Sequence, residues 1–487
     1  MKTSMKAELS NYVSNLDKDI YTVYNLPEEV IATIFAYVSR SPLSFRENLL
    51  KVTEEKAKQF HEKWVLNYGH ASVAELATVH IGIERVSRLF SALLERSNLF
   101  ISPIEYSQRY QKPKRGDFYT PIELDAPEYE SLKKEFIDYQ YRLYDDYTRL
   151  FDLLLANYRK TEARKDNEKE KAYESRIAKA SFEDARYILS LATHTNLGLT
   201  ANARAMEDSL IHLLSSEYPE VRQRGEEIKE QVVYALPTLV KYAKANRFLS
   251  ESRNYLKEHQ QTFSKQKSTS TNPSVTLLHY TTKGSSHSEE KALNIILPEL
   301  LYQYGTMSLD SLKSLMKEKS QEDKLRLFLE SLSSLGSHDN PPQAFEAISY
   351  KMELTLSESC WHQLLRHRKI RFTWQYPTVE HGYRIPPKVI KAGGKDLFTE
   401  VMNYSQSIYT QLKDKLPLVA HYTVTNAHYR RVTGEFTLWE LYHLINLRMT
   451  LEAQWEIREL VQEIVSEIQK IHPHLLQPAL DRLFARI

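Results

Sequence analysis

The sequence predicts an α+β fold built from two similar halves, and three observations support this prediction. The 487 residues include 12 glycines and 31 tyrosines, a balance that argues against a turn-dense all-β chain and for long helices. Short β-prone stretches open the two halves, at residues 20–24 and 275–280. Both halves end on long patterns with apolar residues three and four positions apart, which is typical of amphipathic helices.

The composition excludes several classes of protein. Lys and Arg number 65 against 63 Asp and Glu, so the formal net charge of +2 gives no electrostatic reason to expect a nucleic acid or a membrane surface as partner. Cys360 is the single cysteine, which excludes an internal disulfide and a cysteine-based zinc site and fits a reducing compartment. The start of the chain lacks an apolar signal core, and no window approaches the ~20 apolar residues of a membrane helix. We therefore expect a soluble, cytoplasmic protein.

The order of features repeats along the chain and gives the predicted domain boundaries. A β-like segment runs into a helical stretch bearing Arg, His and Ser at residues 71–97, and again at residues 344–369. Between the halves, residues 251–291 have a middle part rich in Ser, Thr, Lys and Gln without an apolar period, which is typical of a linker. We predict a first domain at residues 1–255, a linker and entry segment at 256–292, and a second domain at 293–487.

One candidate site is the polar stretch SPIEYSQRY at residues 102–110, which follows an apolar helical pattern. We predict a loop here that can hold a phosphate. Arg109 offers a bidentate fork, and the hydroxyl groups of Ser102 and Ser107 and backbone N–H groups complete the cradle. A capped, polar loop at a helix exit explains the same residues without a ligand, and the pattern alone leaves both interpretations open.

A second candidate is the triplet Arg366-His367-Arg368, at the end of a predicted helix whose N-cap is Ser357 or Ser359. Such a triplet suits a polyanionic ligand, although cations at a helix C-terminus also complement the helix dipole. His362 and His367 are five positions apart and lie on different helix faces, so we expect no metal site.

Two further stretches carry an arginine in a helical pattern. Asn202 and Arg204 lie in the first half, and Arg448 lies in the second half on an apolar helix. A buried Arg448 needs an anionic partner, because an unpaired buried charge is very costly. That partner is either a ligand or a glutamate of the same chain, and the sequence favours neither.

Together these stretches resemble the flavin-dependent thymidylate synthases, the ThyX family, twice along the chain. The family signature runs Arg-His-Arg, two residues, then Ser-x-Asn-Glu-x-Ser-x-Arg-Tyr. The first copy resembles the distal part of this signature and also a family segment His-x-Ser/Thr-x-x-Glu. Its matching residues are His70, Ser72, Glu75, Ser102, Glu105, Ser107, Arg109 and Tyr110. Where the family has Arg-His-Arg, this copy has residues 95–97 or 97–99.

The second copy has the complementary part of the signature. Its Arg366-His367-Arg368 triplet is intact and begins twenty residues after Glu346, the spacing that the family uses. In place of the distal Ser, Asn, Ser, Arg and Tyr, this copy has Arg371, Thr373, Tyr376, Thr378 and Val379.

The same division recurs downstream. The first copy keeps residues similar to the family's phosphate-binding arginine and Asn-x-Arg flavin contact, which are Arg186, Asn202 and Arg204. It has Leu213 where the family has an arginine that activates uracil. The second copy has His421 and Trp439 in the former places but keeps the activating arginine as Arg448. Each copy therefore lacks what the other retains.

This division has a physical meaning in the family, whose active sites form between subunits. One subunit gives Arg-His-Arg and the activating arginine, and another gives the Ser-x-Arg-Tyr loop. The resemblance implies two tandem ThyX-like domains, each a mixed sheet flanked by long helices, packed as a pseudo-dimer with one composite active site. It also implies that two chains pair as a homodimer that mimics the family's four subunits.

The reaction that the resemblance implies is reductive methylation of dUMP to dTMP, with methylenetetrahydrofolate as carbon donor, FAD as redox carrier and NADPH as reductant. Residues that would bind dUMP are Glu105, Tyr106, Ser107, Gln108, Arg109, Arg186, Gln363, Arg366 and Arg448. Residues that would hold FAD are Ser72, Asn202, Arg204, Arg366, His367 and Arg368. We expect Arg448 to be catalytic, because a fixed cation beside the uracil ring stabilises the charge that develops as C5 becomes nucleophilic.

Other functions remain open. A protein that has lost activity but keeps the fold would serve as a nucleotide-binding or scaffolding partner. A flavin- and folate-dependent methylase or hydroxymethylase would act on another pyrimidine nucleotide, since residues 373–376 can reshape the base or folate pocket. A flavin-free thymidylate synthase needs a cysteine nucleophile, and we expect Cys360 to be a core residue instead.

Overall fold

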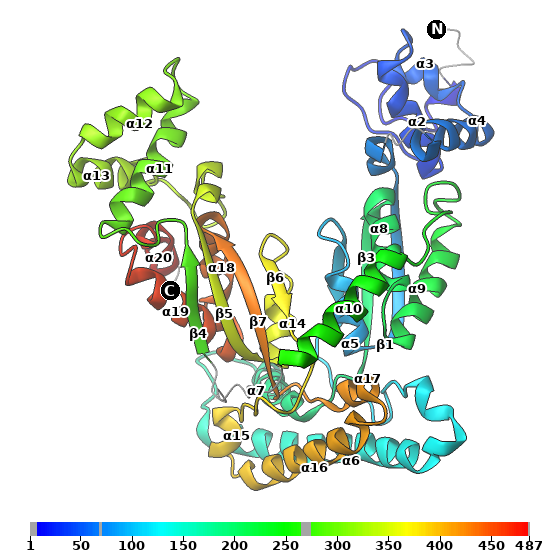
Figure 1. Cartoon of the computed structure of the whole chain (residues 1–487), viewed down its shortest axis with the longest axis vertical. Coiled ribbons are helices and arrows are strands. Elements are labelled where there is room, and N and C mark those ends of the chain that lie inside the picture. Colours follow the sequence, from blue (N-terminus) through cyan, green and yellow to red (C-terminus); the bar gives the residue numbers. More distant parts are fainter. Residues whose placement is uncertain (1–6, 68–70, 264–273, 486–487) are drawn as a thin grey trace. The chain divides into compact units, whose positions relative to one another are not determined.

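The computed structural model describes residues 7–67, 71–263 and 274–485, and packing groups these residues into two units (Figure 1). Unit 1 comprises the described residues within Met1–Ser107, Gly116–Asp138 and Leu191–Ser268. Unit 2 comprises those within Gln108–Arg115, Tyr139–Ser190 and Thr269–Ile487. Two segments from the first half of the sequence therefore pack with the second half. The predicted boundaries of the two copies, at residues 255 and 292, remain a prediction.

The sheet of unit 1 has three strands in the order β1-β3-β2. Its strands are β1 (Thr78–Ser87), β2 (Ser102–Glu105) and β3 (His194–Asn202). Both outer strands are antiparallel to β3, with Thr78 opposite Asn202. The helix α5 (Arg88–Glu95) follows β1 directly, because the Ser87 side chain accepts a hydrogen bond from the N–H of Phe90 and caps the helix.

The sheet of unit 2 repeats this arrangement and adds one strand, in the order β4-β5-β7-β6. Its strands are β4 (Ser274–Tyr280), β5 (Ser349–Ser357), β6 (Arg371–Trp374) and β7 (Tyr429–Thr437). Ser349 lies opposite Thr437, and α14 (Glu358–Leu364) follows β5 with Ser357 as its N-cap. The strand predicted at residues 275–280 is confirmed, and of the two predicted caps, Ser357 and Ser359, the structure has Ser357. The internal repeat is visible as equal strand order.

The prediction that each sheet is mixed is wrong. Every strand pair among the described residues is antiparallel. The connection β1–α5–β2 does place two strands parallel to one another, as a strand–helix–strand crossover requires. However, β3 lies between them and pairs with both, and β7 does the same between β5 and β6. A strand from much later in the chain therefore converts each parallel pair into two antiparallel ones.

A buried glutamate ties the first helix turn of each repeat to a later helix. In unit 1, Ser87 donates from Oγ and N to Glu220, at 2.6 and 2.9 Å. In unit 2, Ser357 donates from the same two atoms to Glu456, at 2.6 and 3.2 Å. Glu220 lies in α9 (Pro219–Val232) and Glu456 lies in α19 (Trp455–Gln469). The equivalent bonds are further evidence that the two sheets are copies of one design.

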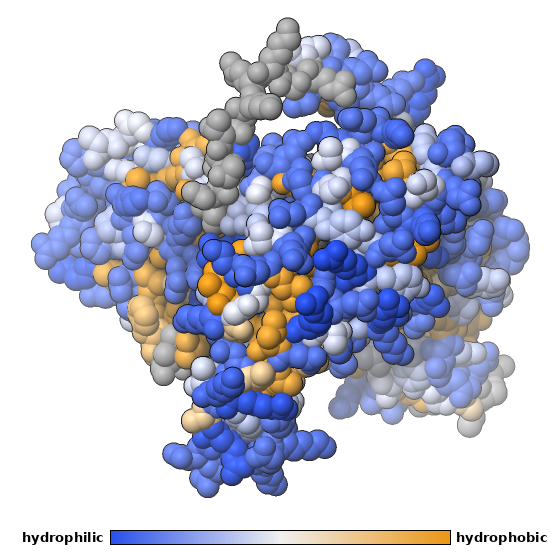
Figure 2. All heavy atoms as spheres, turned by 90° about the horizontal axis from the view of Figure 1, so that it is seen from below, coloured by the Kyte–Doolittle hydropathy of each residue, from blue (hydrophilic) through white to orange (hydrophobic). Residues whose placement is uncertain are grey.

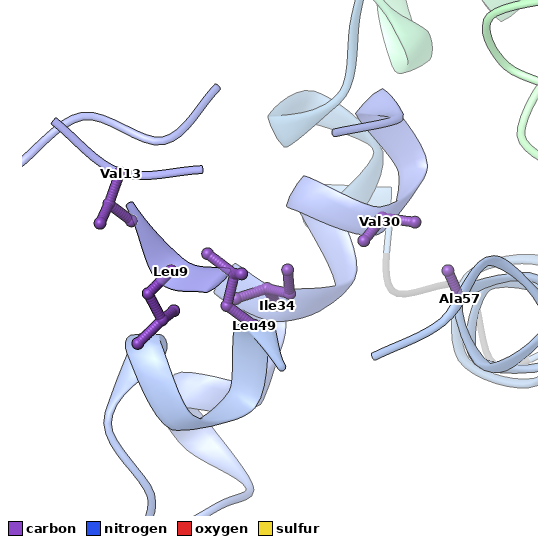
Figure 3. Close-up of a cluster of buried hydrophobic side chains, with 6 residues drawn as sticks. All are labelled: Leu9, Val13, Val30, Ile34, Leu49 and Ala57. Atoms are coloured by element: carbon purple, nitrogen blue, oxygen red, sulfur yellow. The ribbon is translucent and has the colours of Figure 1, made fainter. Parts of the chain in front are cut away.

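A helical cluster forms the N-terminal part of unit 1, with α2 (Glu28–Ala36), α3 (Phe45–Leu49) and α4 (Glu54–Phe60). In its buried core, Leu9, Ile34 and Leu49 point toward one another (Figure 3). The strand expected at residues 20–24 is reduced to a single bridge between Val13 and Val23, because helices and not strands surround it. The remaining long helices of unit 1 are α8 (Ala203–Leu214) and α10 (Arg247–Phe263).

Helices make up most of the rest of unit 2, and several of them are long, as expected. Those from the first half of the sequence are α6 (Glu130–Thr161), which joins this unit from Tyr139 onward, and α7 (Glu170–Ala185). Those from the second half are α11 (Ser288–Tyr302), α12 (Leu309–Glu318), α13 (Gln321–Ser331), α15 (Pro387–Lys391), α16 (Lys395–Lys413), α17 (Pro417–Ala420), α18 (Leu438–Arg448) and α20 (Gln477–Phe484). Tyr139 of α6 packs edge-on against Tyr404 of α16, with 5.2 Å between ring centroids.

Two other expectations concern the linker and the single cysteine. Residues 251–263, the start of the expected linker, form the C-terminal part of α10, and the middle of the linker at 264–273 lies outside the described residues. Cys360 is fully buried in α14, which confirms it as a core residue.

Hydrophilic residues cover most of the face seen in Figure 2, and apolar residues gather there in patches. In the parts of the chain that the structure describes, no helix combines the length and apolar character needed to cross a membrane.

Candidate functional site

The stretch at residues 102–110 is only partly a loop. Its first four residues form β2, so the prediction of a loop over the whole stretch is wrong, because pairing with β3 straightens them. Glu105 is buried at the end of β2 and forms an ion pair with Arg88 at 2.5 Å. Tyr106 follows, and its N–H donates to the carbonyl of Asn196 at 2.8 Å. Ser107 is half-buried, and it is the last residue of the first segment of unit 1.

The predicted flavin residues of unit 1 gather at the start of α8. Asn202 is the N-cap of that helix, and its side chain accepts from the N–H of Ala205 at 2.8 Å. Arg204, in the first turn, forms an exposed ion pair with Glu75 at 2.5 Å. Glu75 and the exposed Ser72 share the 3₁₀ segment η3 (Ala71–Leu76). His70 lies outside the described residues.

These groups fit the phosphates of a dinucleotide. A helix N-terminus carries unpaired N–H groups and a positive partial charge, which favour an anion. Exposed ion pairs such as Arg204–Glu75 are weak, typically ~0–1 kcal/mol, so an anionic ligand can replace the carboxylate at low cost.

Unit 2 brings Arg109 into contact with residues from both halves of the sequence. Its Nε donates to Oε2 of Glu183, on α7, at 2.6 Å. Its Nη2 donates to the carbonyl of Glu452, which follows α18, at 3.2 Å. The Arg109 side chain keeps about a fifth of its surface exposed, 21%, so its guanidinium remains accessible to a ligand.

Arg186 lies beside it on the short segment η6 (Arg186–Ile188) and is buried. Its Nε donates to the carbonyl of Glu183 at 3.2 Å. Asn426 holds this region together: its Nδ2 donates to the carbonyl of Arg186 at 2.9 Å and to Oε1 of Gln108 at 3.2 Å. The sequence analysis missed Asn426, because nothing in its neighbourhood forms a recognisable motif.

The Arg366-His367-Arg368 triplet lies just after α14, which ends at Leu364. The turn there alternates in exposure, so that Arg366 and Arg368 face solvent while His367 is buried. Gln363, on the last turn of α14, donates from Nε2 to Oε1 of Gln454 at 3.3 Å. The two exposed guanidiniums suit anionic groups such as the phosphates of a dinucleotide.

Arg448 is the last residue of α18 and is half-buried. Its Nε donates to Nε2 of His367 at 3.0 Å, and its Nη2 donates to the carbonyl of Gln363 at 3.4 Å. Both acceptors are neutral, so the glutamate partner considered from the sequence is not the one that holds Arg448. This leaves the guanidinium charge available to an anionic or polarisable ligand.

The arginines of unit 2 act on one another electrostatically. Burial lowers the pKa of Arg448, and the positive charges of Arg366 and Arg109 lower it further. Positive charges that lower the pKa of a neighbouring arginine favour an anionic ligand beside them, because the anion would offset their mutual repulsion.

Buried contacts between the two halves of the sequence hold these arginines in place. Tyr187, next to Arg186, donates its hydroxyl hydrogen to Glu456 at 2.5 Å and accepts from Gln454 at 2.9 Å. Asp184 accepts from the indole N–H of Trp455 at 2.8 Å. Residues 454–456, just before and at the start of α19, therefore pack against the segment that carries Arg186.

The fold and this arginine-rich site define a protein with two copies of one α+β design. The chain belongs to the family described as "Thymidylate synthase complementing protein", whose model matches residues 21–238 and 276–474. The two separate matches confirm the tandem fusion of ThyX-like copies that the sequence predicted.

Similar proteins fall into two groups. A UPF0159 protein of Chlamydia pneumoniae is 26% identical and covers 96% of this chain and 92% of the relative. A UPF0159 protein of Thermoplasma acidophilum is 24% identical over 87% of this chain and 88% of the relative. A flavin-dependent thymidylate synthase of Clostridium tetani is 28% identical over 45% of this chain and 82% of the relative. Relatives of the first group match both copies, whereas the last matches less than half of the chain.

Proposed function

We propose that this protein is an FAD-dependent thymidylate synthase, which converts dUMP to dTMP with methylenetetrahydrofolate and NADPH at one composite active site. The observation that carries the proposal is the packing within unit 2. There Arg109 donates to the carbonyl of Glu452, and the carbonyl of Arg186 accepts from Asn426, so both arginines of the first copy contact residues of the second. The charges of Arg109 and Arg366 both act on Arg448.

Each group has a defined role in this proposal. Arg109 and Arg186 bind the nucleotide phosphate, with Gln108 beside them and the neighbouring residues 105–107 completing the loop. Gln363 and Arg366 contact the nucleotide from the second copy. Arg448 lies beside the uracil ring, where its charge stabilises the negative charge on the ring oxygen as C5 attacks the carbon donor.

FAD, when bound, accepts and donates the hydride that the reduction requires. We propose, as the resemblance implies, that the residues that contact it are Ser72, Asn202, Arg204, Arg366, His367 and Arg368. Helix α8 would contribute the positive end of its dipole, and the arginines would neutralise phosphate charge.

The reciprocal site does not keep the same chemistry. By the resemblance, Tyr376 and His421 stand where the signature has a serine and the phosphate-binding arginine. Their rings stack on one another, with centroids 5.2 Å apart and an interplanar angle of 15°. A stacked aromatic pair offers no cationic fork to a phosphate, which supports a single active site per chain. The homodimer and the cytoplasmic location remain predictions.

The proposal is tested first by the visible spectrum of the purified protein with FAD, recorded before and after dUMP is added. Flavin bands that shift with dUMP support a shared site, and dTMP formation with NADPH and methylenetetrahydrofolate establishes the activity. A protein that binds FAD and dUMP but forms no dTMP would instead be an inactive relative, and dCMP in the same assay tests a changed base preference.

Arg109→Ala is expected to weaken dUMP binding by about 10- to 100-fold, since it removes one charge-assisted contact to the phosphate. Deoxyuridine, which lacks the phosphate, is the matched control ligand and should bind both proteins equally. Isothermal titration with the two ligands checks this. Equal weakening for both would mean that Arg109 does not contact the phosphate.

Arg204→Ala is expected to weaken FAD binding by about tenfold while the midpoint of thermal unfolding stays unchanged, because an exposed ion pair contributes little to stability. Glu75→Ala is the control, since it breaks the same ion pair but keeps the guanidinium. Flavin fluorescence titration distinguishes the two. If both variants lose FAD equally, the ion pair and not the arginine is what matters.

A further inference from the structure

Three side chains in unit 2 are linked in a row by hydrogen bonds, and the last of them is Arg448. Glu440 accepts a hydrogen bond from Nδ1 of His367 at 3.0 Å, and Nε2 of His367 accepts from Nε of Arg448 at 3.0 Å. Both Glu440 and His367 are buried, with 3% of each side chain exposed. The nucleotide would meet only the last member of this chain.

The geometry determines the protonation of each member. An arginine Nε always carries hydrogen, so Nε2 of His367 must accept through its lone pair. The imidazole proton is then on Nδ1, and Oε1 of Glu440 accepts it, a role that a carboxylate fills without offering a competing donor. A protonated Glu440 would instead donate to Nδ1, place the imidazole hydrogen on Nε2 and oppose it to the N–H of Arg448.

The position of Glu440 points to this role rather than to helix capping. Glu440 stands three residues after Thr437, the N-cap of α18, in the pattern of a capping box. In α3, the Glu47 carboxylate in the same pattern accepts a hydrogen bond from the N–H of Ser44 and closes the box. The Glu440 carboxylate is directed to His367 instead, although the N–H of Glu440 still bonds to Thr437.

We infer that Glu440 is a positioning residue for the proposed reaction: through His367 it fixes the imidazole tautomer that holds Arg448 by Nε. The described residues engage two of the five N–H donors of Arg448, at Nε and Nη2, so the other three can face the ligand. An arginine held by its Nε cannot swing away when the negative charge develops, which is the preorganisation that electrostatic catalysis requires. This inference rests on the proposed function for its meaning in catalysis.

The charged groups around Glu440 set the pH range in which the hydrogen bonds from Glu440 through His367 to Arg448 are kept. Burial raises the pKa of Glu440 to about 7; His443 and Lys369 lower it and Glu346 raises it. Burial and the charge of Arg448 lower the pKa of His367 to about 3, so the imidazole stays neutral at neutral pH. As pH falls through about 7, Glu440 takes up a proton and the hold on Arg448 is lost.

The test compares Glu440→Gln with Glu440→Ala. The amide oxygen of glutamine still accepts from Nδ1, so Glu440→Gln should keep kcat at pH 8 and lose the acidic limb of the pH–rate profile. Glu440→Ala should lower kcat by roughly 100-fold with little change in KM for dUMP, since a misplaced catalytic group costs about that much. Equal losses in both variants with an unchanged pH profile would overturn the inference.

Two further measurements separate this inference from the proposed function. Glu289→Gln is the matched control, because Glu289 also accepts from a histidine, His474 at 2.8 Å, but in a structural contact; its pH profile should match the wild type. Histidine ¹⁵N chemical shifts should show His367 protonated at Nδ1 in the wild type and in Glu440→Gln, and not in Glu440→Ala. A wild type that forms no dTMP refutes the proposed function, whereas a His367 protonated at Nε2 refutes the inference whatever the activity.

Discussion

Arg448→Ala is expected to lower kcat for dTMP formation by roughly 100- to 1,000-fold, because it removes the group that stabilises charge on the uracil ring in the transition state. Arg448 is half-buried, and its hydrogen bonds go to neutral acceptors, so within the described residues no carboxylate pairs with its charge. The binding of FAD should stay close to that of the wild type, because the proposal gives Arg448 no flavin contact. Steady-state kinetics and flavin titration check both parts.

Two variants show whether the effect is specific. Arg448→Lys keeps the charge but loses the fork that bonds His367 and Gln363 at the same time, so it should recover only part of the lost rate. Arg326→Ala removes an exposed arginine of α13 that pairs with Asp323, and it should leave the rate unchanged. A fully active Arg448→Ala would contradict the assignment of Arg448 as the catalytic residue.

Glu456→Leu is expected to destabilise unit 2 by about 3–5 kcal/mol. Three donors lose their acceptor in this variant: the Tyr187 hydroxyl and the Oγ–H and N–H of Ser357. All three are buried, so water cannot replace the carboxylate. Urea denaturation followed by tryptophan fluorescence suits this test, since four of the five tryptophans, at positions 361, 374, 439 and 455, belong to unit 2.

The equivalent residue of unit 1 provides the comparison. Glu220 accepts from the Oγ–H and N–H of Ser87, so Glu220→Leu removes the acceptor of both donors and should destabilise unit 1. Glu456→Gln retains one amide oxygen as acceptor and should fall between the wild type and Glu456→Leu. Equal stability of Glu456→Leu and the wild type would mean that the buried network contributes nothing to folding.

Local patterns in the sequence determined a substantial part of this protein. The strand at residues 275–280, the cap at Ser357 and the burial of Cys360 follow from propensity, capping chemistry and hydropathy over a few residues, and each is confirmed. The repeat and the family also follow from the sequence, because spacing between motif residues survives in each copy even where the residues change. The assignment of residues to dUMP and FAD remains a prediction.

Other features were decided only by the tertiary structure. The sequence indicates strand, helix, strand, but not that β3 and β7 insert between those strands and make each sheet antiparallel. The roles of Asn426 and Glu440 depend on partners far away in the sequence, for which short-range periodicity carries no signal. The packing of residues 108–115 and 139–190 with the second half has the same origin, because their contacts, such as Arg109 with Glu452, form only when the chain has folded.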